Sequence, residues 1–330
     1  MTGHVRLGLI GSGNMGPTWA EAGMRYAPNA SVVAVGGGTR APGLAAQFGF
    51  EVEPSVDALL ARSDVDAVIV CSPQVTHHQN VLLAAAAGKH ILVEKPMALN
   101  VAQADEMIAA ADAAGVTLAV VSQHRFRRTP VAAKRLIESG AIGTVRMVQV
   151  RGITPPWTLP KGNQPWADLG FHLCDILRWL VGSEVTLVSA QFGEFGSVPP
   201  QQTAFVIYRF ASNALAHVWF SYEITKPGLG SIMQFLVTGS KGMIDLDSYA
   251  ACRLSRDDGW DVVAEQPDPN PTDAMSPYRM ESYGAQVADF VDAILTGRDP
   301  MISGRDGRKT MVMLEAAVAS DATRTMVAVT

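Results

Sequence analysis

Residues 5–16 read VRLGLIGSGNMG, and this stretch decides the fold of the first third of the chain. The apolar run Val5–Ile10 is followed at once by three glycines in the spacing G-x-G-x-x-G, namely Gly11, Gly13 and Gly16. Glycines at a strand-to-helix turn let the backbone approach the pyrophosphate of a dinucleotide, which then lies at the start of the helix. The stretch therefore predicts a dinucleotide site, and the alternative is a plain strand-to-helix turn.

Short apolar runs alternate with helical stretches through the rest of the first third. The runs are Val5–Ile10, Ser31–Val35, Ala67–Cys71, His90–Val93 and Thr117–Val121. Continuous apolar strands that alternate with helices are typical of a parallel sheet covered on both faces. We therefore expect an α/β Rossmann domain with a doubly wound parallel sheet over residues 1–122.

After Gln123 the pattern changes to successive strand-like runs with no helices between them. The runs are Thr144–Arg151, Val185–Phe192, Thr203–Phe210, Ala214–Tyr222, Ile232–Thr238 and Gly242–Asp247. Such runs predict a large, mostly antiparallel sheet with one exposed face. Residues 123–330 are thus expected to form an α+β domain for substrate binding and oligomerisation. Its helices are expected at Pro130–Ser139, Asp168–Val181, Ser282–Leu295 and Gly304–Arg324.

Composition limits the classes of partner. The chain has 330 residues with a net charge of −5 and both signs spread along it, so no basic stripe indicates nucleic acid or a membrane surface. Its apolar runs are far shorter than the roughly 20 residues that span a bilayer. Three widely spaced cysteines (Cys71, Cys174 and Cys252) indicate reduced thiols, with no metal cluster. We expect a cytoplasmic protein with no nucleic-acid or membrane partner and no metal.

The segment after the second predicted strand, Gly36–Arg40, bears on the choice of dinucleotide. Sites for NAD usually carry an acidic residue there, yet no Asp or Glu occurs between Glu21 and Glu51. The guanidinium of Arg40 and the hydroxyl of Thr39 are able to bind a 2′-phosphate, which favours NADP(H) over NAD(H). The alternative is a solvated Arg40, with NAD bound through the backbone.

Two further segments carry candidate catalytic groups. Lys95 follows the strand His90–Val93, and ligands of an open parallel sheet bind beyond the carboxyl ends of its strands. Asp168 and His172 are four residues apart on a predicted amphipathic helix, so the carboxylate is able to orient the imidazole. Taken singly, each has a simpler alternative: a solvent-exposed lysine, a helix-capping aspartate and a surface histidine.

Together these segments resemble the glucose–fructose oxidoreductase / inositol dehydrogenase (Gfo/Idh/MocA) family. The marks are the glycine loop, Glu94-Lys95-Pro96 and the D-x-G-x-H-x-x-D run from Asp168 to Asp175, with a looser one at Ser72–His77. The resemblance implies Lys95, Asp168 and His172 as the catalytic group. The expected cofactor contacts are Gly11, Gly13, Asn14, Met15, Gly16, Thr39, Arg40, Ser72, Pro73, His77, Glu94 and Lys95.

The expected reaction is hydride transfer between a nicotinamide and a secondary alcohol or ketone of a sugar, polyol or sugar derivative. In oxidation His172 takes the hydroxyl proton, Lys95 bonds the same oxygen, and Asp168 holds these partners in position. The substrate pocket is expected between the two domains. Its expected residues are His124, Arg125, Trp157, Trp166, Asp168 and His172. The alternatives are core tryptophans and an interdomain ion pair for Arg125.

Two broader alternatives stay open, a dinucleotide sensor and a scaffold whose sheet mediates association only, although the scaffold leaves the glycine loop unexplained. Some proteins of the resembled family bind a dinucleotide as sensors without turnover, although the retained catalytic group argues against that role. A homodimer or homotetramer is expected through the apolar face of the large sheet. That face is expected to include Val206, Tyr208, Val218 and Phe220, unless these residues face their own core.

Overall fold

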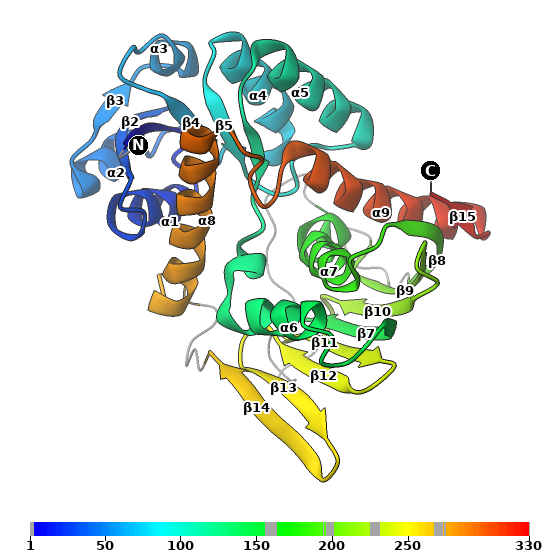
Figure 1. The fold of residues 1–330 in the computed structure, drawn as a ribbon. Helices are drawn as coiled ribbons and strands as arrows, with labels where there is room; N and C mark the ends of the chain where they lie inside the picture. Colours follow the sequence, from blue (N-terminus) through cyan, green and yellow to red (C-terminus); the bar gives the residue numbers. More distant parts are fainter. Residues whose placement is uncertain are drawn as a thin grey trace. The chain divides into compact units, whose positions relative to one another are not determined.

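The computed structural model describes residues 3–155, 164–193, 195, 201–224, 232–266, 273 and 275–329. By its internal contacts the chain divides into two compact units (Figure 1). Unit 1 consists of Met1–Gln123 and Thr272–Lys309, and unit 2 of His124–Pro271 and Thr310–Thr330. The expected division at residues 122 and 123 follows chain order, whereas by contacts residues 272–309 group with the first unit.

Unit 1 contains a six-stranded parallel sheet in the order β3-β2-β1-β4-β5-β6. The strands are β1 (Val5–Ile10), β2 (Ala30–Gly36), β3 (Glu51–Glu53), β4 (Ala67–Val70), β5 (His90–Val93) and β6 (Leu118–Val120). Every side chain of β4 is buried, as expected for a strand covered on both faces. The predicted Rossmann sheet is thereby confirmed.

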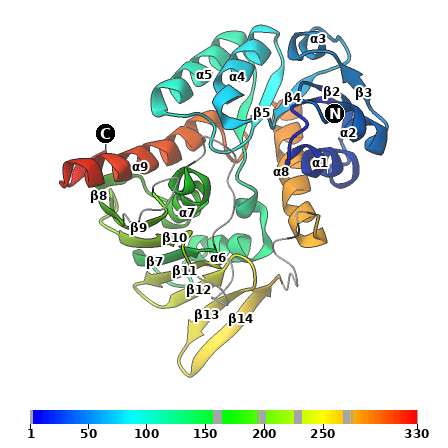
Figure 2. The same cartoon turned by 180° about the vertical axis from the view of Figure 1, so that it is seen from behind.

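Helices cover this sheet in two layers, which Figure 2 shows as α4 with α5 and α1 with α8. The helices before residue 123 are α1 (Gly16–Glu21), continued by the π-turn η1 (Ala22–Tyr26), α2 (Ala41–Phe48), α3 (Val56–Leu60), α4 (His77–Ala86) and α5 (Val101–Ala114). Asn100 caps α5 by accepting the N–H of Gln103 at 2.9 Å, and Gly115 ends it with a φ of +66°.

Helix α8 (Pro277–Thr296) comes late in the chain but packs against α1, η1 and β2 of unit 1. Gln286 bonds the last strand of the sheet, since its Oε1 accepts the Ser122 N–H at 3.2 Å and its Nε2 donates to the Val120 carbonyl at 2.9 Å. Tyr283 meets the ring of Trp19 edge to face at 4.9 Å. Both contacts extend the core of the Rossmann sheet with residues from the far end of the sequence.

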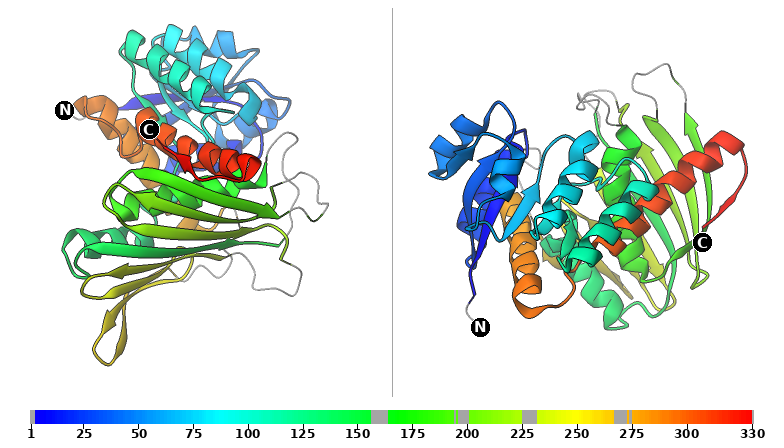
Figure 3. Two further views of the ribbon diagram at one scale, coloured as in Figure 1. Left: turned by 90° about the vertical axis from the view of Figure 1, so that its right-hand side faces the viewer. Right: turned by 90° about the horizontal axis from the view of Figure 1, so that it is seen from above.

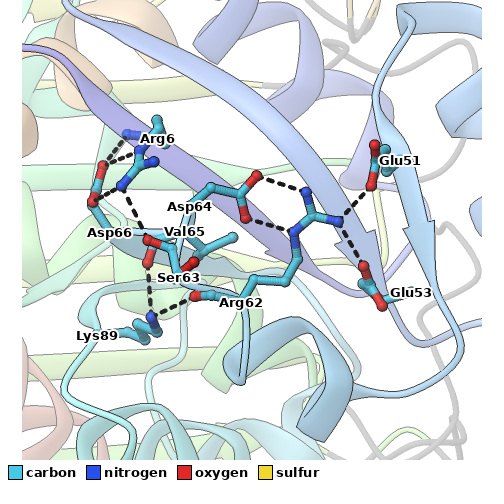
Figure 4. Close-up of polar contacts among 9 residues, drawn as sticks. All are labelled: Arg6, Glu51, Glu53, Arg62, Ser63, Asp64, Val65, Asp66 and Lys89. Atoms are coloured by element: carbon cyan, nitrogen blue, oxygen red, sulfur yellow. Dashed lines mark hydrogen bonds and ion pairs between the residues drawn. The ribbon is translucent and has the colours of Figure 1, made fainter.

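The edge strand β3 is held by charged side chains, as Figure 4 shows. The Arg62 guanidinium lies 2.6 Å from carboxylate oxygens of Glu51 and Glu53 in this strand, and 2.7 Å from Asp64. These carboxylates raise the pKa of the Arg62 guanidinium above its ordinary value, through hydrogen bonds with Asp64 first. The strand thus depends on ion pairs with a following loop more than on apolar burial.

Unit 2 contains a nine-stranded sheet in the order β14-β13-β12-β11-β7-β10-β9-β8-β15 (Figure 3). Only the β7–β10 pair among its described pairings is parallel. The strands are β7 (Val145–Ile153), β8 (Val185–Gly193), β9 (Thr203–Phe210), β10 (Leu215–Ser221), β11 (Ile232–Gly239), β12 (Met243–Asp247), β13 (Ala251–Arg256), β14 (Gly259–Glu265) and β15 (Val327–Ala328). The large, mostly antiparallel sheet is therefore confirmed.

Three helices pack on one face of this sheet: α6 (Arg128–Glu138), α7 (Pro165–Val181) and the later part of α9 (Gly304–Thr323). The expectation that four apolar residues form the exposed face is wrong. Val206, Tyr208, Val218 and Phe220 have no exposed area because the alternation of β9 and β10 turns them towards the helices. Their neighbours Phe205 and Ile207, with Met147 of β7, are more than half exposed on the opposite face.

Within the described ranges, no helix combines the length and hydropathy needed to cross a bilayer.

Candidate functional site

The glycine turn, Gly11–Gly16, connects β1 to α1 at the carboxyl edge of the unit 1 sheet. Gly11 has a φ of +108°, and a Cβ there would lie 2.8 Å from backbone atoms of Ser72, which follows β4. A Cβ on Gly13 would instead meet only the tip of Arg40, at 3.8 Å. The turn therefore packs closely against the Ser72 backbone at Gly11 and leaves free space beside Gly13. This arrangement fits a pyrophosphate brought close to the backbone.

The segment after β2 lies over this turn. Both Nη atoms of Arg40 donate to Oδ1 of Asn14 at 3.2 Å, and Arg40 and Thr39 are exposed. Gly38 has a φ of +85°, and any side chain there would overlap Ser12. The structure thus brings the predicted contacts Asn14 and Arg40 together at an exposed position. Strand β2, which precedes this segment, contains no carboxylate, so the charged group described here is the Arg40 guanidinium.

The predicted contact His77, the first residue of α4, lies inside unit 1. It is 2% exposed, and its ring nitrogens lie 3.0 Å from the Pro96 carbonyl oxygen (Nδ1) and 2.9 Å from that of Ser72 (Nε2). Burial lowers the pKa of the imidazole, and the two backbone hydrogen bonds oppose this shift. The ring therefore contacts backbone, while Ser72 and Pro73 form the turn between β4 and the helix.

Glu94 and Lys95 follow β5. Glu94 is buried, and its carboxylate accepts the indole N–H of Trp19 at 2.8 Å and the backbone N–H of Lys95 at 3.0 Å. Burial raises the pKa of this carboxyl group. Lys95 is half-buried and joined to Pro96 by a cis peptide bond. Glu94, expected as a cofactor contact, thus supports the backbone of Lys95 from the inside of the unit.

In unit 2, helix α7 begins at Pro165, three residues before Asp168, and ends at Val181 with Gly182 in the left-handed conformation. Asp168 therefore lies in the first turn and does not occupy the N-cap, which is Gln164. Its Oδ2 accepts the hydroxyl of Tyr222 at 2.7 Å. Sequence reasoning missed Tyr222, because no local pattern links the end of β10 to the start of α7.

His172 and His124 come together within unit 2. Their ring centroids are 4.7 Å apart in an edge-to-face arrangement, and both side chains are buried. Nδ1 of His124 lies 3.0 Å from the hydroxyl of Ser248, another residue that the sequence did not single out. The predicted proton carrier thus lies beside a second imidazole that Ser248 holds in place.

The other predicted substrate contacts have structural partners. Arg125 donates two hydrogen bonds to Asp175, at 2.9 and 2.6 Å, and both side chains are buried in unit 2. Trp166 is 1% exposed and donates to the Leu314 carbonyl at 3.3 Å, so it belongs to the core, the alternative left open by the sequence. Trp157 lies outside the described residues.

The predicted catalytic residues come from both units, Lys95 from unit 1 and Asp168 with His172 from unit 2. Within the part of the chain that the structure describes, no three His, Cys, Asp or Glu side chains gather as a metal site.

The sequence of the chain is similar to those of known oxidoreductases. The model of an oxidoreductase family (Gfo/Idh/MocA) with an NAD-binding Rossmann fold matches residues 5–122, and the model of that family's C-terminal alpha/beta domain matches residues 134–329. The chain is 28% identical to an inositol 2-dehydrogenase of Rhizobium meliloti, with 98% of this chain and 99% of that protein covered. It is 29% identical to a myo-inositol 2-dehydrogenase of Thermotoga maritima, with 95% of each covered.

Among solved structures, the chain is similar to GenD2 from gentamicin A biosynthesis, which was crystallised in complex with NAD. The TM-score is 0.85 and the identity 25%, with 99% of this chain and 97% of that chain covered.

Proposed function

The chain belongs to the Gfo/Idh/MocA oxidoreductase family, and from that premise we propose that it transfers a hydride between a nicotinamide dinucleotide and a secondary alcohol or ketone of a sugar, polyol or sugar derivative. The observation that carries the proposal is the set of polar side chains in unit 2, in which the buried His172 lies against the buried His124 and the half-buried Asp168 accepts the Tyr222 hydroxyl. A protein that only binds a dinucleotide has no need of this group. The inositol dehydrogenases among the relatives support a polyol substrate.

The bound nicotinamide supplies or accepts the hydride. In oxidation His172 takes the hydroxyl proton, and in reduction it returns a proton to the carbonyl oxygen. The ammonium of Lys95 donates a hydrogen bond to that same oxygen and stabilises its developing negative charge by about a few kcal/mol. Asp168, fixed by Tyr222, orients the imidazole one helical turn away. The mechanism requires the two units to present Lys95 and His172 to one hydroxyl group.

For the dinucleotide we propose NADP(H) in preference to NAD(H). Support comes from the exposed Arg40 beside Asn14 and from the absence of a carboxylate between Glu21 and Glu51. The proposed contacts are the glycine turn with Asn14 and Met15, the segment Thr39–Arg40, the turn Ser72–Pro73, and Lys95. His77 and Glu94 support these loops from within.

The two chain segments have separate proposed tasks. Residues 1–122 bind the dinucleotide, with α8 as an added layer, and residues 123–330 bind substrate and carry the subunit contact. The proposed contact is a homodimer or homotetramer through the open sheet face with Phe205, Ile207 and Met147. We place the enzyme in the cytoplasm, in keeping with its three free cysteines.

The direct test follows the reduced-nicotinamide absorbance band while inositols, other polyols and sugars are added with NADP+ or NAD+. We expect turnover with at least one polyol or sugar, and faster turnover with NADP+. Dinucleotide binding without turnover across a broad panel would instead identify a sensor.

A further inference from the structure

Two loops meet at the carboxyl edge of the unit 1 sheet, one after β4 (residues 71–76) and one after β5 (residues 94–98). Two side chains, those of His77 and Gln74, connect them. His77 reaches the Pro96 carbonyl at 3.0 Å and the Ser72 carbonyl at 2.9 Å, and Gln74 Nε2 donates to the Ala98 carbonyl at 2.9 Å. The residues held in the second loop, Pro96 and Ala98, lie within three positions after Lys95.

The peptide backbone around Lys95 is therefore fixed on both sides. Its own N–H donates to the buried Glu94 carboxylate, and the carbonyl of the next residue, Pro96, receives His77. Carbonyl oxygens only accept hydrogen bonds, so one N–H of a neutral His77 serves one loop, and a protonated ring serves both. Burial lowers the pKa of His77, which favours the neutral ring. The ring is 2% exposed and contacts these loops from inside.

We propose that His77 is a positioning residue for Lys95: it sets where the ammonium points and contacts neither substrate nor dinucleotide. This inference rests on the proposed function, in which Lys95 acts on the substrate oxygen. A displacement of about 1 Å at a catalytic group is able to cost on the order of a hundredfold in rate. A loop that carries such a group needs fixed anchors, and here these are the Glu94 carboxylate, the His77 ring and the Gln74 amide.

The test compares His77→Phe, which fills the same buried space without a donor, with His77→Gln, which keeps a donor. The matched control is His78→Gln, because His78 is the next residue of α4 and its ring faces Glu106 at the surface. For His77→Phe we expect kcat to fall about 10- to 100-fold while the Kd for NADP+ stays within about threefold. His77→Gln should recover part of the loss, and His78→Gln should match wild type.

A second readout does not depend on turnover. An amine-reactive acylating reagent modifies Lys95 at a rate that mass spectrometry of the whole protein and its peptides can follow. This rate reports how well the loop protects the half-buried ammonium. We expect Lys95 in His77→Phe to react about threefold faster or more, because local opening exposes it. Gln74→Ala, a change in a half-exposed residue, should act in the same direction and serves if His77→Phe fails to fold.

The two hypotheses fail separately. If wild type shows no turnover, the proposed function fails, while the acylation readout still decides the role of His77. If folded His77→Phe keeps both the kcat and the Lys95 acylation rate of wild type, the positioning role is wrong.

Discussion

Arg125 was expected to bind substrate, but its guanidinium is 3% exposed and paired with the fully buried Asp175. Two charges held out of water depend on each other, because removing one leaves the other buried without that counter-charge. At the level of single residues, the buried ion pair with Asp175 gives Arg125 a role in stability.

The first prediction concerns this pair. Arg125→Met should lower the free energy of unfolding by about 3–5 kcal/mol, because it leaves the Asp175 carboxylate buried without its cation. Urea denaturation measures the loss. Arg62→Met is the comparison, since the Arg62 side chain pairs with partly exposed carboxylates; its smaller effect should shrink further in added salt. Equal losses in the two variants would contradict this account of Arg125.

The second prediction concerns cofactor choice. Arg40→Ala should lower kcat/KM for NADP+ about 10- to 100-fold, the range expected for a lost charge-assisted hydrogen bond to phosphate of about 1.5–3 kcal/mol. The value for NAD+ should change less than about twofold, because NAD lacks the 2′-phosphate that a guanidinium binds. Steady-state kinetics with both dinucleotides checks this. A parallel loss with NAD+ would assign Arg40 to the shared part of the cofactor.

At the level of secondary-structure elements, the sequence predicts the strands that form long apolar or alternating runs, and it missed the short strands β13 (Ala251–Arg256) and β15 (Val327–Ala328). The five buried strands of unit 1 all correspond to apolar runs. β3 was not predicted, since two of its three residues, Glu51 and Glu53, are charged and their partner Arg62 is supplied by a later loop. β14 was not predicted either, because it is an edge strand exposed along most of its length. Both strands form because they pair with a neighbouring strand, and the local sequence of each carries no sign of that neighbour.

The third prediction concerns α8, which completes the Rossmann unit from the end of the chain. Gln286→Ala should cost about 1–3 kcal/mol of unfolding free energy, because the change leaves the Ser122 N–H and the Val120 carbonyl without this buried partner. Chemical denaturation measures the cost, and Ala285→Ser at the adjacent exposed position is the control. If Gln286→Ala unfolds like wild type, α8 adds no polar anchoring to β6.

At the level of the whole molecule, the sequence points to candidate site residues but not to the side chains that contact them. Lys95, Asp168 and His172 belong to short local motifs. Tyr222 and Ser248, which contact Asp168 and His124, come from strands and turns far along the chain. Such contacts arise where helical segments pack against residues that follow strands of the large sheet, and no short segment encodes them.

The fourth prediction concerns the open face of that sheet. Ile207→Glu should convert the proposed homo-oligomer into monomers, because a charge would then lie in an apolar contact between copies. Sedimentation velocity measures the mass, and Ala87→Glu on the exposed end of α4 is the control. A wild-type chain that sediments as a single monomeric species would defeat the prediction.

The central claim is that Lys95 and His172, from different units, act on one hydroxyl group. The most direct measurement is a double-mutant cycle on kcat with Lys95→Met, His172→Asn and the double variant, with NADP+ affinity followed in parallel. Groups that act as a unit are strongly non-additive. We predict that each single change lowers kcat by about 100-fold or more, and that the double variant is little slower than either one. Fully additive losses, or near-normal kcat in either single variant, would contradict the claim.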